Sequence, residues 1–213
     1  MKKRIEPYHI RLVMIVSSDI HVNPLSFIEE VLRHGVTMIQ LRERQTQTTD
    51  YGELTTFAEE ILALCKKYNV PMIVNGDVQL AESIRADGIH LEQNNSVYKN
   101  LPMYFNDKIV GLSIKNKEEF YNSDLTKVSY ISAGRVFNND TGDTEEDAIG
   151  LKGLEKLYKL VGDFPTLATG GINGCNYRDC LNAGADGVGV IRGIRDSEDI
   201  ETTIRQLLGK TEI

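Results

Sequence analysis

The stretch Thr37-Met38-Ile39-Gln40-Leu41-Arg42-Glu43-Arg44 joins a strand pattern to a pair of cations. Its first six residues alternate between two kinds of side chain, the period of two expected of a β-strand with two different faces. Arg42 and Arg44 follow at the carboxyl end of this strand, and their spacing makes them point the same way. Two guanidiniums placed like this can bind a phosphate group. The alternative is a pair of surface arginines balanced by Glu43 and Asp50.

Similar short apolar stretches recur on both sides of this strand and alternate with amphipathic segments. The pattern predicts strands at 11–18, 37–42, 71–75, 88–91, 109–114, 128–133, 165–169 and 187–191. It predicts helices at 24–34, 51–68, 78–84, 117–121, 151–161, 176–183 and 197–208, and a short one within 93–106. Repeating β/α units of about 25 residues favour an α/β fold, a single-domain (β/α)8 TIM barrel over residues 1–213. A doubly wound open sheet is the alternative.

Composition limits the classes of function. The chain has 213 residues, of which 41% are hydrophobic and 26% charged, as in ordinary globular proteins. A net charge of −7 argues against nucleic acid or an anionic membrane surface as a partner. Cys65, Cys175 and Cys180 have neither the number nor the spacing of a disulfide framework or a zinc site. With no signal-peptide pattern and no apolar run of membrane length, we expect a cytoplasmic protein.

Polar residues and glycines gather where the predicted strands end. In a (β/α)8 barrel these ends form the active-site face, and phosphate commonly binds after the seventh and eighth strands. Gly170 and Gly171 follow the seventh strand, and Arg192 follows the eighth. Backbone N–H groups at a glycine turn, together with the N-terminus of the following helix, can bind an anion. The sequence therefore predicts a small-molecule ligand that carries phosphate.

The chain resembles a known family through an ordered set of short motifs. They are Gln40-Leu41-Arg42-Glu43-Arg44, Val74-Asn75, Ala86-Asp87-Gly88-Ile89-His90-Leu91, Val110-Gly111-Leu112-Ser113, Gly170-Gly171-Ile172 and Gly184-Ala185-Asp186-Gly187-Val188. In this order they resemble the thiamine-phosphate synthases and their TenI-type relatives. The resemblance implies one of two activities. Synthases of the family join a pyrimidine diphosphate to a thiazole phosphate with Mg²⁺ on the diphosphate, whereas TenI-type enzymes isomerise the thiazole phosphate.

The resemblance also implies a set of substrate-binding residues. Positions that hold the ligands in the family correspond here to Gln40, Arg42, Arg44, Asn75, Ser113, Asn139, Thr141, Gly170, Gly171, Ile191 and Arg192. The two aspartates that hold the metal are not kept, since Gly76 and Asn95 stand in their places. Mg²⁺ prefers carboxylate oxygens in octahedral geometry, so the loss of both is serious. The lysine expected near Thr141 is also absent.

A tautomerase needs a group that moves a proton and no metal. In TenI-type enzymes a histidine after the fifth strand can do this, and Lys115 takes that position here. A lysine can act as a base only where burial or nearby cations favour its neutral amine. The alternative is that Lys115 is a solvated charge. Glu92 is a second candidate acid or base, and we expect His90 to be a hydrogen-bonded core residue.

Three functions follow from these residues. The favoured one is a TenI-type thiazole tautomerase with no cofactor. The second is a thiamine-phosphate synthase whose Mg²⁺ site is rebuilt from Asp77, Glu92 or Asp140. The third is a non-catalytic regulator that binds a phosphate ligand such as thiazole phosphate or thiamine phosphate. The resemblance is also compatible with a homodimer.

Overall fold

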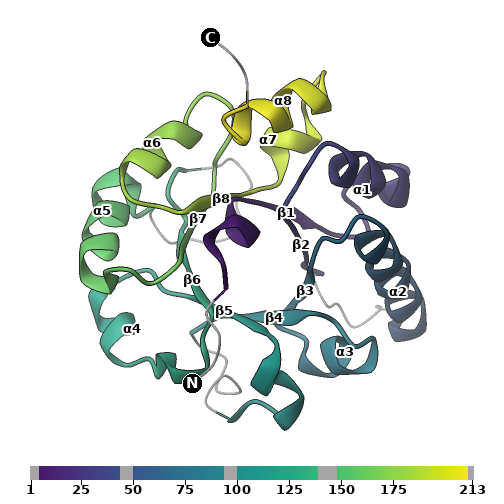
Figure 1. Cartoon of the computed structure of the whole chain (residues 1–213), viewed down its shortest axis with the longest axis horizontal. Helices are drawn as coiled ribbons and strands as arrows, with labels where there is room; N and C mark the ends of the chain where they lie inside the picture. The colour runs from purple at the N-terminus through teal and green to yellow at the C-terminus, as the bar shows by residue number, and fades with distance from the viewer. Residues whose placement is uncertain (1–4, 44–49, 94–99, 139–147, 211–213) are drawn as a thin grey trace.

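The computed structural model describes residues 5–43, 50–93, 100–138 and 148–210. Eight parallel strands close into a barrel in the order of the chain (Figure 1). They are β1 (Leu12–Val16), β2 (Met38–Leu41), β3 (Met72–Asn75), β4 (Gly88–Leu91), β5 (Ile109–Ser113), β6 (Tyr130–Gly134), β7 (Thr166–Thr169) and β8 (Gly187–Val190). Strand β1 pairs with both β2 and β8, which closes the sheet. The predicted (β/α)8 barrel is confirmed, and the open-sheet alternative is wrong.

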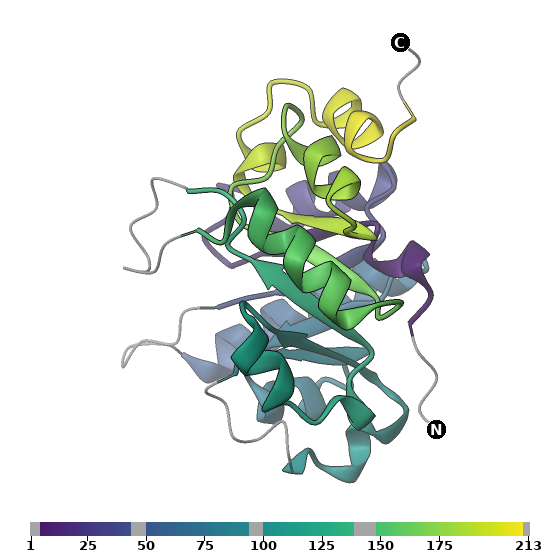
Figure 2. The same ribbon diagram turned by 90° about the vertical axis from the view of Figure 1, so that its left-hand side faces the viewer.

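Helices surround the barrel as an outer ring (Figures 1 and 2). They are α1 (Pro24–Arg33), α2 (Tyr51–Lys67), α3 (Val78–Ser83), α4 (Lys117–Tyr121), α5 (Gly150–Val161), α6 (Tyr177–Asn182), α7 (Arg192–Arg195) and α8 (Ile200–Leu207). Short 3₁₀ turns are η1 (Pro7–Ile10), η3 (Met103–Asp107) and η4 (Leu125–Lys127).

Several elements begin or end one to three residues away from the sequence expectation, and the described part of the segment expected to hold a short helix within 93–106 contains the 3₁₀ turn η3. Helix α8 begins at Ile200 and not at 197, because the Asp199 side chain accepts the N–H of Thr202 at 2.9 Å and caps the helix there. The eighth strand stops at Val190, and the turn of helix α7 that follows places Arg192 beside the barrel mouth.

Alternation along each strand divides the core into two parts. In β1, Leu12, Met14 and Val16 face the helices and belong to the large cluster between barrel and helices. Val13 faces the barrel interior, where it joins a smaller cluster with Met38, Ile73, Tyr130, Leu167, Ile5 and Ile10. The last two come from the chain around η1, which lies over one end of the barrel (Figure 1). The interior is therefore apolar and filled at this end.

Two aspartates hydrogen-bond to the first residues of β3 and β7 in the same way, on opposite sides of the barrel. The Asp87 carboxylate accepts the N–H of Met72 at 2.9 Å, and the Asp186 carboxylate accepts the N–H of Thr166 at 2.8 Å. Each aspartate precedes the glycine that begins the next strand. An added Cβ at Gly187 would lie 1.8 Å from the Ile10 carbonyl oxygen, so only glycine fits there. We call these two interactions the aspartate clamps.

Among the described residues, none of the helices combines the length and the apolar character that crossing a membrane requires.

Candidate functional site

A cleft opens at the carboxyl end of the barrel, and its floor contains one residue from each strand. These floor residues are Ile15, Gln40, Asn75, His90, Ser113, Ser132, Thr169 and Gly189. Strand alternation explains five of them, because they lie two residues beyond an interior position of the filled end. The other three, His90, Ser113 and Gly189, each pair in register with one of these five. The cleft volume is about 1920 Å³. This exceeds the roughly 1,000 Å³ of a large single-ligand pocket, so the cleft has room for more than one small molecule.

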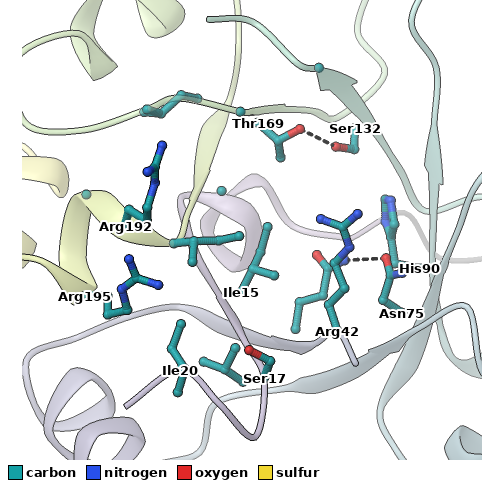
Figure 3. A pocket seen from close by; sticks show the side chains of 18 of the residues that line it. Ile15, Ser17, Ile20, Arg42, Asn75, His90, Ser132, Thr169, Arg192 and Arg195 are labelled. Atoms are coloured by element: carbon teal, nitrogen blue, oxygen red, sulfur yellow. Dashed lines mark hydrogen bonds between the residues drawn. The ribbon is translucent and has the colours of Figure 1, made fainter. Parts of the chain in front are cut away.

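Hydrogen bonds fix the polar floor residues in pairs. The Gln40 amide donates to the Asn75 side-chain oxygen at 2.9 Å, and Gln40 is only 4% exposed (Figure 3). The Ser132 and Thr169 hydroxyls lie 3.2 Å apart on the opposite side of the floor (Figure 3). Because each pair uses only part of its hydrogen-bonding capacity, the remaining donors and acceptors can meet a ligand.

His90 lies at the centre of a buried chain of hydrogen bonds. Its Nδ1 is 2.9 Å from the Tyr130 hydroxyl, and its Nε2 is 3.0 Å from the Ser113 hydroxyl. The pKa of His90 is lowered to about 4, chiefly by burial; Glu92 raises this pKa, and Arg42 lowers it. His90 is therefore neutral at physiological pH, and it is hydrogen-bonded as the sequence analysis expects.

Cationic side chains approach the cleft from two sides (Figure 3). Arg42, just beyond β2, lies beside Asn75 and His90. Arg192 and Arg195 of α7 lie on the other side, and Ile15 lies between the two groups. A ligand with two anionic ends and a flat apolar middle matches this arrangement.

The glycine turn after β7 also lines the cleft. Gly170 and Gly171 have φ angles of +91° and +69°, a region that favours glycine. An added Cβ at Gly170 would lie 2.6 Å from the Arg135 side chain, so the close approach also requires glycine. The Asn176 amide donates to the Gly171 carbonyl at 2.9 Å and holds the turn against the start of α6.

The two candidate proton-transfer residues, Lys115 and Glu92, both line the cleft and are both half-buried. The backbone N–H of Lys115 donates to the Glu119 carboxylate at 2.6 Å, which fixes the chain just after β5.

Glu43 of the cleft lining is also held by hydrogen bonds, since its carboxylate accepts both the N–H and the hydroxyl of Ser18. Burial raises the pKa of Glu43.

The carboxylates expected to rebuild a metal site do not come together among the described residues. Asp77 caps α3 by accepting the N–H of Leu80 at 2.9 Å, and the Tyr51 hydroxyl donates to it at 3.2 Å. It is also absent from the residues that line the cleft. No three His, Cys, Asp or Glu side chains within 5–43, 50–93, 100–138 and 148–210 cluster as metal ligands would. Glu92 alone of the described candidates reaches the cleft.

Of the residues expected at the site, Gln40, Arg42, Asn75, Glu92, Ser113, Lys115, Gly170, Gly171, Ile191 and Arg192 all line this cleft. Arg44, Asn139 and Thr141 lie outside the described residues, as do Asn95 and Asp140.

Several residues of the cleft were not predicted from the sequence. Ser132 and Thr169 are small polar residues inside apolar strands, and only their position two residues after the interior-facing Tyr130 and Leu167 reveals them. Arg195 was not predicted because it lies at the end of α7, a four-residue helix that the sequence pattern does not reveal. Its guanidinium binds Asp196 at 2.6 Å and lowers the pKa of that carboxyl.

Comparisons with known proteins agree with this geometry. The sequence profile of the family described as thiamine monophosphate synthase matches residues 12–194. Thiamine-phosphate synthase 1 of Streptococcus pneumoniae R6 is 40% identical over 185 residues, which cover 87% of this chain and 88% of that protein. Thiamine-phosphate synthase of Staphylococcus carnosus is 42% identical over 181 residues, 85% of each chain. The thiamine phosphate pyrophosphorylase structure from Pyrococcus furiosus superposes with a TM-score of 0.82, at 26% identity and 96% coverage of both chains.

Proposed function

This chain belongs to the thiamine monophosphate synthase family, and on that premise we propose that it is a thiamine-phosphate synthase. In this reaction a pyrimidine diphosphate and a thiazole phosphate are joined into thiamine phosphate. The names of the relatives support this activity better than the thiazole tautomerase that the sequence analysis favours. The synthase therefore replaces the tautomerase as the favoured activity.

The observation that carries the proposal is the pair of cationic sides across one cleft. A synthase holds two phosphorylated substrates at once, whereas a tautomerase holds one. Arg42 on one side suits the diphosphate, and Arg192 on the other suits the phosphate of the thiazole. Ile15 between them offers an apolar contact for the two aromatic rings.

The chemistry that this arrangement serves is a substitution at carbon. The bond between the pyrimidine methylene carbon and the diphosphate oxygen breaks, and its electron pair leaves with the diphosphate. The thiazole nitrogen lone pair forms the new C–N bond at the same carbon. Charge grows on the leaving diphosphate, so guanidiniums and hydroxyl donors fixed beforehand stabilise the transition state. In this proposal Arg42 and Ser113 have this role, because both line the cleft.

The Gln40–Asn75 pair positions the pyrimidine side. Gln40 is held by the hydrogen bond to Asn75 and is nearly fully buried, so its orientation is set before a ligand arrives. Holding both rings in one orientation turns a reaction between two molecules into one within a single complex. Mg²⁺ enters no step of this proposal, because only Glu92 of the described candidate ligands lines the cleft, while Asp77 caps α3.

A specific observation keeps the tautomerase as the second candidate. The resemblance places metal-binding aspartates at positions that are Gly76 and Asn95 here. A tautomerase needs only one phosphate site and a proton carrier, for which Lys115 and Glu92 line the same cleft.

One experiment separates the candidates. The purified protein is incubated with pyrimidine diphosphate and thiazole phosphate, with and without Mg²⁺, and thiamine phosphate and diphosphate are measured. A synthase releases both products in equal amounts. Tautomer conversion without thiamine phosphate would overturn the proposal in favour of a tautomerase. Binding of thiazole phosphate without either reaction would favour a non-catalytic regulator.

A further inference from the structure

The buried chain from Tyr130 through His90 to Ser113 reaches the cleft from inside the barrel. We propose that Tyr130 and His90 are positioning residues that make the Ser113 hydroxyl a hydrogen-bond donor toward the ligand. The Tyr130 O–H donates to His90 Nδ1, and the N–H at His90 Nε2 donates to the Ser113 oxygen. The hydrogen of Ser113 is thereby left for an anionic oxygen in the cleft. The ligand side of this inference rests on the proposed function.

The register of β4, β5 and β6 brings the members of this hydrogen-bond chain together. His90 on β4 is level with Gly111 on β5, and Gly111 is level with Tyr130 on β6. An added Cβ at Gly111 would lie 2.4 Å from both His90 Nδ1 and the Tyr130 hydroxyl. The missing side chain thus opens the space in which the tyrosine crosses one strand to reach the histidine. Ser113 lies two residues beyond Gly111 on the same face, and its hydroxyl is hydrogen-bonded to the other ring nitrogen, His90 Nε2.

Hydrogen-bond accounting selects the tautomer. Tyr130 is 0% exposed, and its hydroxyl has one partner among the described residues, His90 Nδ1. If Nδ1 carried the hydrogen, the buried phenol hydrogen would have no acceptor, which is costly. If Nδ1 is bare, the phenol donates to it and every group is satisfied. The hydrogen of His90 then lies on Nε2 and is directed at Ser113.

The alternative tautomer would reverse the role of the serine. Ser113 would then donate to Nε2 and present only lone pairs to the cleft, which suits a cation or a proton and not a phosphate oxygen. Because the protonated ring is disfavoured by burial, the two neutral forms are the relevant choice. The hydrogen-bond chain of Tyr130, His90 and Ser113 therefore decides whether the serine offers the cleft a donor or only acceptors.

Nitrogen NMR of histidine-labelled protein tests the tautomer directly, without substrate. We expect His90 to show a pyrrole-type Nε2 and a pyridine-type Nδ1, with its signals assigned by their loss in His90→Gln. In Tyr130→Phe the two signals should move toward each other as the other tautomer becomes populated. A pyrrole-type Nδ1 in the wild-type protein would overturn the proposal, whatever the kinetics of the variants.

Kinetics test the effect on Ser113. Tyr130→Phe should lower kcat for thiamine phosphate formation about tenfold with little change in KM, the effect of one hydrogen bond lost from the transition state. Ser113→Ala should lower kcat at least as much. In Ser113→Ala, adding Tyr130→Phe should cause no further loss, because the tyrosine acts through the serine.

The matched control is Tyr177→Phe. Tyr177 is a buried tyrosine of α6 outside the cleft lining, and its hydroxyl accepts from Arg178 at 2.9 Å. Its variant should keep wild-type kcat. Additive effects of Tyr130→Phe and Ser113→Ala would overturn the positioning role. A wild-type protein that makes no thiamine phosphate would refute the proposed function, and the NMR result would still decide the tautomer.

Discussion

Gly111→Ala is expected to destabilise the barrel by about 3 kcal/mol. The new Cβ would lie 2.4 Å from His90 Nδ1 and from the Tyr130 hydroxyl, both rigid and buried. Overpacking a filled core costs about 1–3 kcal/mol, and leaving the buried nitrogen and hydroxyl unpaired costs about 1–3 kcal/mol more. The lower chain entropy of alanine returns about 0.5–1 kcal/mol. The melting temperature should fall by about 6–12 °C for a domain of this size.

Urea unfolding followed by circular dichroism measures this loss as a lower midpoint at an unchanged slope. Gly189→Ala is the matched control, because Gly189 is also an interior strand glycine. Its added Cβ would lie 2.8 Å from one Thr169 methyl group and 3.5 Å from the next atom, so less must move than at Gly111. We expect a loss below about 1 kcal/mol there. Equal losses in the two variants would show that His90 and Tyr130 do not confine Gly111.

Three further predictions concern His90, Arg192 and Asp77. Burial holds the pKa of His90 at about 4, below its ordinary 6.5, so the unfolded chain takes up the proton first. The free energy of unfolding should then fall by roughly 3 kcal/mol between pH 6.5 and 4, and a flat profile in urea titrations would contradict this. Arg192→Ala should weaken thiazole phosphate binding about tenfold by calorimetry, with Arg192→Lys in between; unchanged affinity would remove Arg192 from the phosphate site. Asp77→Ala should cost about 1 kcal/mol of stability through the lost helix cap, whereas Asp77→Asn should keep both cap and thiamine phosphate formation; a large activity loss in Asp77→Asn would indicate a metal ligand.

The barrel could be predicted from the sequence because each strand is short, apolar and followed by a helix pattern. The carboxyl ends of the predicted strands and the family motifs also pointed to Gln40 and Ser113, and both line the cleft. The ends of elements were less predictable. Helix α7 is four residues long, too short for a periodic signal, and it carries Arg192 and Arg195.

The hydrogen-bond partners within the site could not be predicted. His90, Gly111 and Tyr130 are far apart in the chain, and only the register of three strands makes them neighbours. The choice between synthase and tautomerase was equally beyond reach. It depends on whether phosphates bind on one or both sides of the cleft, and Arg195, on the second side, lies beyond every motif that was recognised.

The aspartate clamps have a consequence for the order of folding. They join residues 15 and 20 positions apart, whereas the contact of Arg11 with the Leu208 carbonyl, at 2.5 Å, joins residues 197 positions apart. The loop-closure entropy for the distant contact exceeds that for the nearest clamp by about 2 kcal/mol. Each clamp can thus form within its own strand–helix–strand unit early in folding. The barrel then closes by joining units whose strand spacing is already set, which reduces the number of registers that the final pairing of β1 with β8 must search.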